Sequence, residues 1–75
     1  MNACVLTRIK GGRARRVLES VRKIDGVRRA VFVWGRYDLV AFIEAPLAAN
    51  IASVAARINA VPGVKSTETL IELAP

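Results

Sequence analysis

The stretch of sequence that decides the fold is RRAVFVWGRYDLVAFIE, residues 28–44. Residues 28–34 and 39–44 are rich in β-branched and aromatic side chains, which favour strands. The four residues between them, Gly35-Arg36-Tyr37-Asp38, are typical of a turn, because Gly adopts positive φ and Asp makes local hydrogen bonds. The stretch therefore predicts a hairpin of two antiparallel strands.

The sequence before the hairpin predicts a strand followed by a helix. Residues 3–9 (ACVLTRI) are apolar and β-rich, and Lys10-Gly11-Gly12 breaks that strand. Gly26 stands where a C-terminal cap glycine is expected after a helix. The apolar residues between these two breaks follow helical spacing and form one face: Ala14, Val17, Leu18, Val21 and Ile24.

The sequence after the hairpin predicts a helix followed by a strand. Pro46 fits the first turn of a helix, and Pro62-Gly63 ends it. Residues 65–73 (KSTETLIEL) alternate toward their C-terminal end and predict a fourth strand. The apolar face of the expected helix consists of Leu47, Ile51, Val54, Ala55 and Ile58.

A shift of 37 residues aligns the two halves of the chain. It places Val17 on Val54 and Val21 on Ile58, and Gly26-Val27 on Gly63-Val64. Two βαβ units of this kind predict an α+β, ferredoxin-like βαββαβ fold, with a four-stranded antiparallel sheet and two helices on one face. Residues 1–75 are expected to form a single domain, given that length.

Both faces of the hairpin are apolar, although two helices can cover only one face of the sheet. Val31 and Val33 oppose Ala30, Phe32 and Trp34 in the first strand, and a similar opposition holds in the second strand. A monomer would leave several hundred Å² of apolar surface exposed, and soluble monomers rarely expose a patch of that size. We therefore expect a second copy to pack against this sheet about a twofold axis, forming a dimeric α+β barrel.

Composition excludes several classes of protein. With one cysteine and no histidine in 75 residues, neither a disulfide framework nor a Cys/His metal site is expected. No apolar run approaches about 18 residues and no signal peptide is visible, so we expect a cytoplasmic chain with no membrane segment. Cys4 is expected to be a small buried residue inside a strand. No catalytic constellation is present, so we expect neither an enzyme nor a cofactor.

The positive charge of the chain, +6 overall, is concentrated in residues 8–36. This distribution has two interpretations at this point. One is a surface for an anion or a nucleic acid, and the other is an ordinary solvated helix face.

The turn at residues 35–38 also has two interpretations. It fits plain turn chemistry, but Arg36 is also suited to bind a carboxylate and Asp38 an ammonium group, the two charges of an α-amino acid.

Three sequence segments, in their order and spacing, resemble the effector-binding domain of the Lrp/AsnC (feast/famine) regulators, often called the RAM domain. The first group is the ACVLTRI strand with Ile24-Asp25-Gly26-Val27. The second is the hairpin motif Val33-Trp34-Gly35-Arg36-Tyr37-Asp38-Leu39-Val40, and the third runs from Val61-Pro62-Gly63 to Thr69. The resemblance covers essentially the whole chain.

This resemblance implies a regulatory, non-enzymatic module of transcription. Members of the family form homodimers through their sheets, and the dimers assemble into octamers or decamers that bind a small effector, commonly an amino acid, between dimers. The resemblance carries over to an effector-binding set consisting of Gly35, Arg36, Tyr37, Asp38, Thr67 and Thr69. Arg36 stands at a variable family position. Trp34 replaces a small residue, and its ring is expected to reshape the pocket.

The family's N-terminal winged helix–turn–helix has no counterpart in this chain, which begins at the effector domain and resembles the stand-alone members. We therefore expect no direct sequence-specific DNA binding, and either effector sensing or co-assembly with full-length Lrp/AsnC regulators. Two alternatives stay open: a nucleic-acid-binding ferredoxin-like domain, favoured by the basic segment, and a small dimeric α+β barrel enzyme. For subunit packing the sequence offers Phe32, Trp34 and Phe42.

Overall fold

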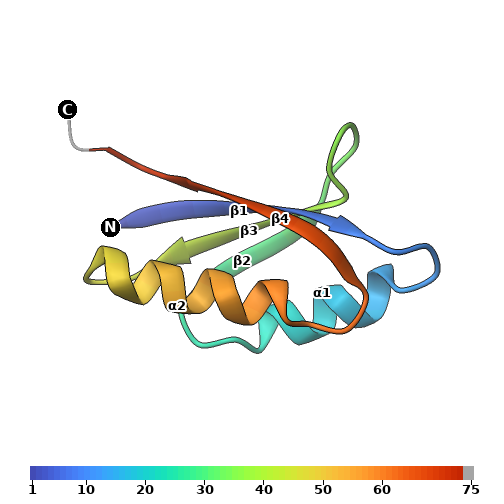
Figure 1. Cartoon of the computed structure of the whole chain (residues 1–75), viewed down its shortest axis with the longest axis horizontal. Helices are drawn as coiled ribbons and strands as arrows, with labels where there is room; N and C mark the ends of the chain where they lie inside the picture. The colour runs from blue at the N-terminus through green and yellow to red at the C-terminus, as the bar shows by residue number, and fades with distance from the viewer. Residues whose placement is uncertain (74–75) are drawn as a thin grey trace.

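The βαββαβ order is present in the computed structural model, which describes residues 1–73. The sheet has four strands in the order β2-β3-β1-β4, and every neighbouring pair is antiparallel. Both helices lie on the same face of this sheet (Figure 1). The elements are β1 (Asn2–Ile9), α1 (Ala14–Arg22), β2 (Val27–Phe32), β3 (Leu39–Glu44), α2 (Ala48–Asn59) and β4 (Val64–Ile71). The predicted fold is confirmed.

The core lies between the helices and one face of the sheet. Successive side chains of a strand point to opposite faces, so alternate residues of β1 and β3 enter this core. The helices supply residues three and four apart, as the sequence pattern predicts. The buried apolar side chains of these four elements are Ala3, Val5, Leu39, Ala41, Ile43, Val17, Leu18, Val21, Ile51, Val54 and Ile58.

Helix α1 is shorter than predicted, and Gly26 is not its C-terminal cap. The helix ends at Arg22 with Lys23 as its cap. The backbone N–H groups of Lys23 and Ile24 donate to the carbonyls of Ser20 and Val21, three residues earlier, which tightens and closes the last turn. Ile24 still packs against the core from outside the helix.

Strand β2 also ends earlier than predicted, at Phe32 rather than at residue 34. The N–H of Val33 donates to the carbonyl of Asp38 at 3.0 Å, which closes a loop that includes Trp34. Because Trp34 belongs to this loop, its side chain is fully exposed. Strand β4 likewise ends at Ile71, two residues before the predicted end, whereas β3 matches its predicted bounds.

The 37-residue repeat appears in the structure as a reciprocal contact between the two halves. Gly26 and Gly63, which are equivalent in the repeat, have φ values of 98° and 100° in the same kind of turn. A Cβ added to Gly26 would lie 2.9 Å from Val54, and one added to Gly63 would lie 3.0 Å from Val17. Each turn glycine therefore packs against the helix of the other half, at equivalent valines.

No helix within residues 1–73 is long and apolar enough to cross a membrane.

Replacing Gly63 with Ala is expected to lower the free energy of unfolding by about 1–3 kcal/mol. The new methyl group would meet Arg13 at 2.8 Å and Val17 at 3.0 Å, at a φ that L-residues avoid. Thermal unfolding followed by circular dichroism measures this loss. Gly11→Ala is the matched control, because nothing lies within 4 Å of a Cβ there. Equal melting temperatures for the two variants would contradict the reciprocal contact.

Candidate functional site

The hairpin loop at residues 33–38 projects from the sheet (Figure 1). Trp34, Gly35 and Arg36 are exposed, and a Cβ at Gly35 would meet nothing within 4 Å. These three residues are therefore free to contact a ligand or another chain.

Asp38 has a structural role that the sequence did not reveal. Its Oδ2 accepts a hydrogen bond of 2.8 Å from the backbone N–H of Ile9. Its own N–H donates to the carbonyl of Thr7 at 2.9 Å. These bonds continue the pairing of β1 with β3 beyond the last strand pair and hold the base of the loop. An ammonium group bound by Asp38 would share the carboxylate with the backbone N–H of Ile9.

Tyr37 connects the loop to β4. Its hydroxyl donates a hydrogen bond to the Glu68 carboxylate. That bond raises the pKa of the Tyr37 hydroxyl above its ordinary value, and desolvation and the negative charge of Glu68 act in the same direction. Arg36 and Arg8 lower the pKa by a smaller amount. The neutral, protonated phenol is therefore the form that holds the loop against the last strand.

Thr67 and Thr69 lie on the other side of β4, under helix α2. In the antiparallel register they pair with Thr7 and Val5, whose side chains are buried beneath the helices. The Thr67 hydroxyl donates to Oδ1 of Asn59 at 3.2 Å. Both threonines line a groove of about 570 Å³ between α2 and β4, whose other lining residues are Ile51, Ala52, Ala55, Ala56, Asn59 and Ile71.

The structure thus divides the six predicted site residues into two groups. Gly35, Arg36, Tyr37 and Asp38 form the loop, and the loop reaches β4 at Glu68. Because side chains alternate along a strand, Glu68 points to the face opposite to Thr67 and Thr69. Within one chain the loop and the threonine groove do not meet, and their joint role in effector binding stays a prediction.

Thr7 is a buried polar residue that the sequence analysis did not single out. It is fully buried, and its hydroxyl has no hydrogen-bond partner within residues 1–73. It lies between Leu39 on β3 and Thr67 on β4. Asn59 and Glu68 were also missed, because no motif marks them and neither pairs with its partner inside one helix or strand.

The face of the sheet away from the helices is apolar and uncovered. We call it the open sheet face. Its side chains alternate with those of the core, and its apolar members are Cys4, Leu6, Val31, Val40, Phe42 and Leu70. Cys4 is half-buried rather than buried, as a residue on this face must be. Of the three aromatic residues offered for subunit packing, only Phe42 lies here. Phe32 pairs with Leu39 on the helix side, and Trp34 belongs to the loop.

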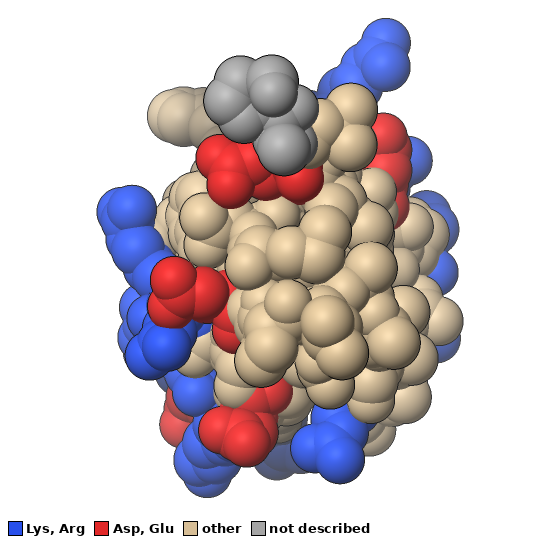
Figure 2. Space-filling model, turned by 90° about the vertical axis from the view of Figure 1, so that its left-hand side faces the viewer, with Lys and Arg blue, Asp and Glu red and all other residues tan. Residues whose placement is uncertain are grey.

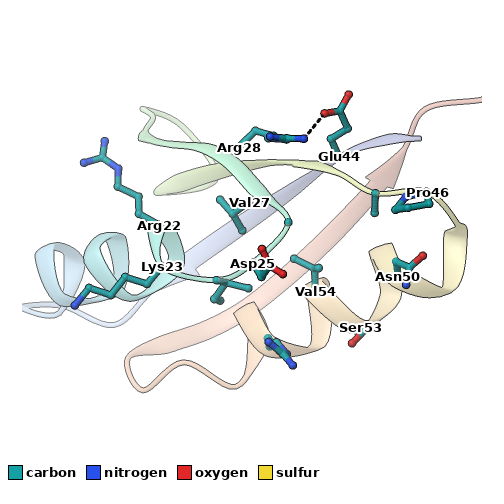
Figure 3. Close-up of a pocket in the computed structure, with 14 residues that line it drawn as sticks. Arg22, Lys23, Asp25, Val27, Arg28, Glu44, Pro46, Asn50, Ser53 and Val54 are labelled. Carbon is teal, nitrogen blue, oxygen red and sulfur yellow. Dashed lines mark ion pairs between the residues drawn. The ribbon is translucent and has the colours of Figure 1, made fainter.

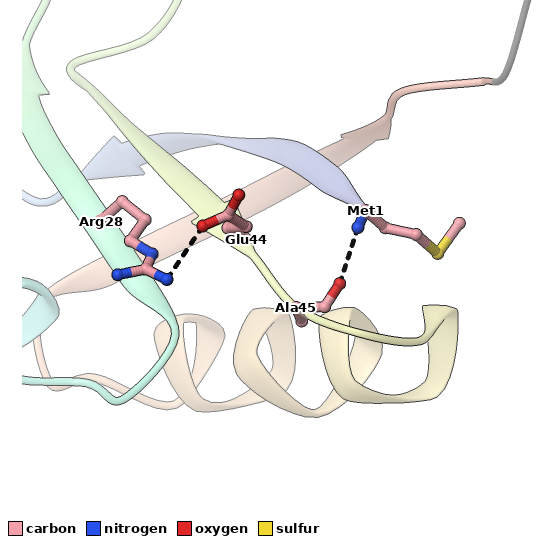
Figure 4. Close-up of polar contacts among 4 residues, drawn as sticks. All are labelled: Met1, Arg28, Glu44 and Ala45. Carbon is pink, nitrogen blue, oxygen red and sulfur yellow. Dashed lines mark hydrogen bonds and ion pairs between the residues drawn. The ribbon is translucent and has the colours of Figure 1, made fainter.

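Charged groups stand at one edge of the open sheet face. Arg28 and Glu44 form an ion pair of 2.9 Å, with more than half of each side chain exposed (Figure 4). The Arg29 guanidinium lies 5.5 Å from the centre of the Phe42 ring. A hollow of about 460 Å³ lies beside them and is lined by Cys4, Phe42 and Leu70, among others. An apolar centre with a polar rim is the usual anatomy of a protein–protein interface.

Another hollow in the described part of the chain is a cleft of about 640 Å³. Arg22 and Lys23 come from the end of α1, and Asn50, Ser53 and Val54 come from α2 (Figure 3). Asp25 lies between these two sets in the same view. The cleft carries charges of both signs, and within residues 1–73 no three His, Cys, Asp or Glu side chains are placed to hold a metal ion.

The comparisons with solved structures reveal close likeness over the whole chain. A protein of Thermus thermophilus, TTHA0845, is 31% identical with a TM-score of 0.88, and the match covers 99% of this chain and 96% of that one. Escherichia coli AsnC is 21% identical with a TM-score of 0.88, but only 51% of that chain is covered. No curated protein matches this sequence.

A third similar structure is that of a protein with a bound amino acid. The transcriptional regulator NMB0573 of Neisseria meningitidis was solved as a complex with L-Met. It is 21% identical with a TM-score of 0.77, and the match covers 97% of this chain and 49% of that one. The family model for the Lrp/AsnC ligand-binding domain matches residues 2–74. This chain therefore belongs to the Lrp/AsnC family of transcription regulators, as a regulatory ligand-binding domain of that generally non-enzymatic family.

Proposed function

We propose that this chain binds an amino acid between two of its dimers and regulates transcription through the assembly that the amino acid stabilises. The chain co-assembles with full-length Lrp/AsnC regulators into rings of eight or ten subunits, and the winged helix–turn–helix of those regulators binds the DNA. The division of the candidate site residues between two sides of the sheet carries this proposal.

The open sheet face supports the dimer. Its aliphatic residues lie around Phe42, and no other part of residues 1–73 covers them. A second copy about a twofold axis brings the same apolar surface against itself. At about 25 cal/mol per Å², burying several hundred Å² of it supplies several kcal/mol before the cost of association.

The two groups of site residues support a site between dimers. A single amino acid cannot reach both the loop and the threonine groove of one chain, because the sheet separates them. A site shared between dimers allows one chain to supply Arg36 and Asp38 and another to supply Thr67 and Thr69. The loop then binds the charged ends of the ligand, and the hydroxyls of the groove offer further hydrogen bonds.

Coupling between binding and assembly follows from linkage. A ligand that contacts residues of two dimers binds only the assembled form, so it stabilises that form in proportion to its concentration and affinity. Its differential affinity for the alternative assemblies sets the direction of regulation. L-Met is the ligand of the Neisseria meningitidis relative, and it is a suitable first probe for this chain.

Titration calorimetry with each of the twenty amino acids tests the ligand. At least one is expected to bind, and Arg36→Gln is expected to weaken that binding about tenfold or more, because a charge-assisted hydrogen bond to the carboxylate is lost. Arg57→Gln removes the same charge from α2 and is expected to leave the affinity unchanged. Unchanged affinity in both variants would overturn the role of the loop, and the absence of any binding would overturn the proposed ligand class.

Light scattering of Phe42→Glu tests the dimer. The parent chain is expected to form dimers or higher assemblies, and the charge placed at the centre of the open sheet face is expected to yield monomers. Phe32→Glu is the matched control, because Phe32 is about half exposed, at 48%, and lies on the helix side of the sheet. A dimer that survives Phe42→Glu and is lost in Phe32→Glu would place the interface elsewhere.

Absorbance titration of the single tyrosine tests how the loop is held. The midpoint is expected above pH 10, and Glu68→Gln is expected to lower it, because the hydrogen bond to the carboxylate raises the pKa. A folded pKa raised above the unfolded value gives stability that is present below the unfolded pKa and lost as the pH rises through the folded one. A midpoint unaffected by Glu68→Gln would show that the loop is not held at β4.

A further inference from the structure

Three of the six acidic side chains of this protein accept hydrogen bonds from groups other than lysines and arginines. Asp38 accepts from the backbone of Ile9, and Glu68 accepts from Tyr37. Glu72 accepts from Asn2, at 3.1 Å. Only Glu44 forms an ion pair, with Arg28. Among residues 1–73, therefore, all lysines and arginines other than Arg28 lack an acidic partner.

Five of these cations share the surface of α1 and its two ends. We call this surface the basic face; it consists of Arg13, Arg15, Arg16, Arg22 and Lys23, all of which are exposed. Residues seven apart lie on the same side of a helix, two turns from each other. Arg15 therefore lies on the same side as Arg22, and Arg16 on the same side as Lys23. Glu19 is the one acidic residue within the helix.

The basic face continues onto the edge of the sheet. A hollow of about 270 Å³ is lined by Arg22 of α1 together with Arg28 and Arg29 of β2. By contrast, the end of the molecule near the N-terminus is largely uncharged at its centre, and its basic groups lie around the margins, mainly along one side (Figure 2). Seven of the twelve lysines and arginines thus belong to the basic face and the adjoining edge of the sheet.

The stability of α1 does not explain the arginines at its N-terminal end. Positive charges at the N-terminal end of a helix oppose its dipole, and the first turn of α1 contains no acidic residue to offset them. Arg13 as the N-cap makes no side-chain capping bond. The placement of Arg13, Arg15 and Arg16 therefore carries a cost for the isolated helix, and we look for their benefit outside it. Arg22 stands in the last turn, where a cation is favourable, and it also donates to the carbonyl of Ala30 at 3.0 and 3.2 Å.

The composition of the basic face favours a phosphate backbone over a protein partner. Protein interfaces have an apolar centre with aromatic anchors, whereas the apolar residues of α1 other than Ala14 are buried in the core. The face also lacks the aromatic platforms on which single strands stack. Guanidinium groups bind phosphate in a bidentate manner. The nine residues of α1 extend about 13 Å, comparable to about four phosphates along one strand of a duplex.

We propose that the basic face binds the phosphate backbone of double-stranded DNA without reading its sequence. Helix α1 lies on the side of the sheet opposite to the open sheet face, so this surface stays accessible when a second copy covers that face (Figure 1). The contact adds to whatever sequence reading a full-length partner supplies, and it does not depend on an amino acid being bound.

Fluorescence anisotropy of the full chain with a labelled duplex of about 30 base pairs tests this proposal. Binding is expected at about 50 mM salt, with a plot of log K against log salt whose slope is about −2 to −4. The double variant Arg15→Gln/Arg16→Gln is expected to weaken binding and to reduce the magnitude of this slope by about 2. A second duplex of unrelated sequence is expected to bind equally well.

Arg57→Gln/Lys65→Gln is the matched control, since it removes the same charge from α2 and β4 and is expected to retain the slope of the parent. All four substituted side chains are exposed, and circular dichroism confirms that each variant is folded. Equal losses in the two double variants would overturn the proposal, because only net charge would then matter. No binding at low salt, or tighter binding to a single strand than to the duplex, would also overturn it.

Discussion

The contact between each turn glycine and the helix of the opposite half is the constraint on which the rest of this structure depends. Gly26 packs against Val54 and Gly63 against Val17, and the 37-residue repeat makes these two contacts equivalent. A Cβ at Gly26 would lie 2.9 Å from Val54, and one at Gly63 would lie 2.8 Å from Arg13, so the neighbouring side chains would have to shift. The absence of a side chain at both glycines therefore allows each turn to lie close to a helix, beside the shared core of aliphatic residues.

Placing both helices on one face leaves the other face to a partner. Leu6, Val40 and Phe42 are as apolar as the residues beneath the helices, yet no other part of residues 1–73 covers them. The same geometry separates Thr67 and Thr69 from the loop that contains Arg36 and Asp38. In the assembly that we propose, a symmetric partner covers the apolar face and completes the candidate binding site.

The charges of the protein are distributed so that the acids stabilise the chain and the bases face outward. Asp38 and Glu68 hold the hairpin loop at its base and at Tyr37, and Glu44 pairs with Arg28 at the sheet edge. Among the cations of α1 and its ends, Arg22 donates to the carbonyl of Ala30, whereas Arg13, Arg15, Arg16 and Lys23 point outward. The molecule therefore has a basic face on the helix layer and an apolar face on the sheet, the two surfaces for which we propose different partners.

The sequence by itself determined the element order, the bounds of β3 and the repeat, because strand alternation and helical spacing are local and each element here follows one of them cleanly. It missed the early ends of α1 and β2, where backbone hydrogen bonds close the turn before the apolar pattern stops. Only the tertiary structure decided that Asp38 anchors the loop to Ile9, that Tyr37 reaches Glu68, and that the threonines lie under α2. Those contacts join residues far apart in the chain, and the handedness of the crossovers, not any local pattern, selects which face of each strand the helices cover.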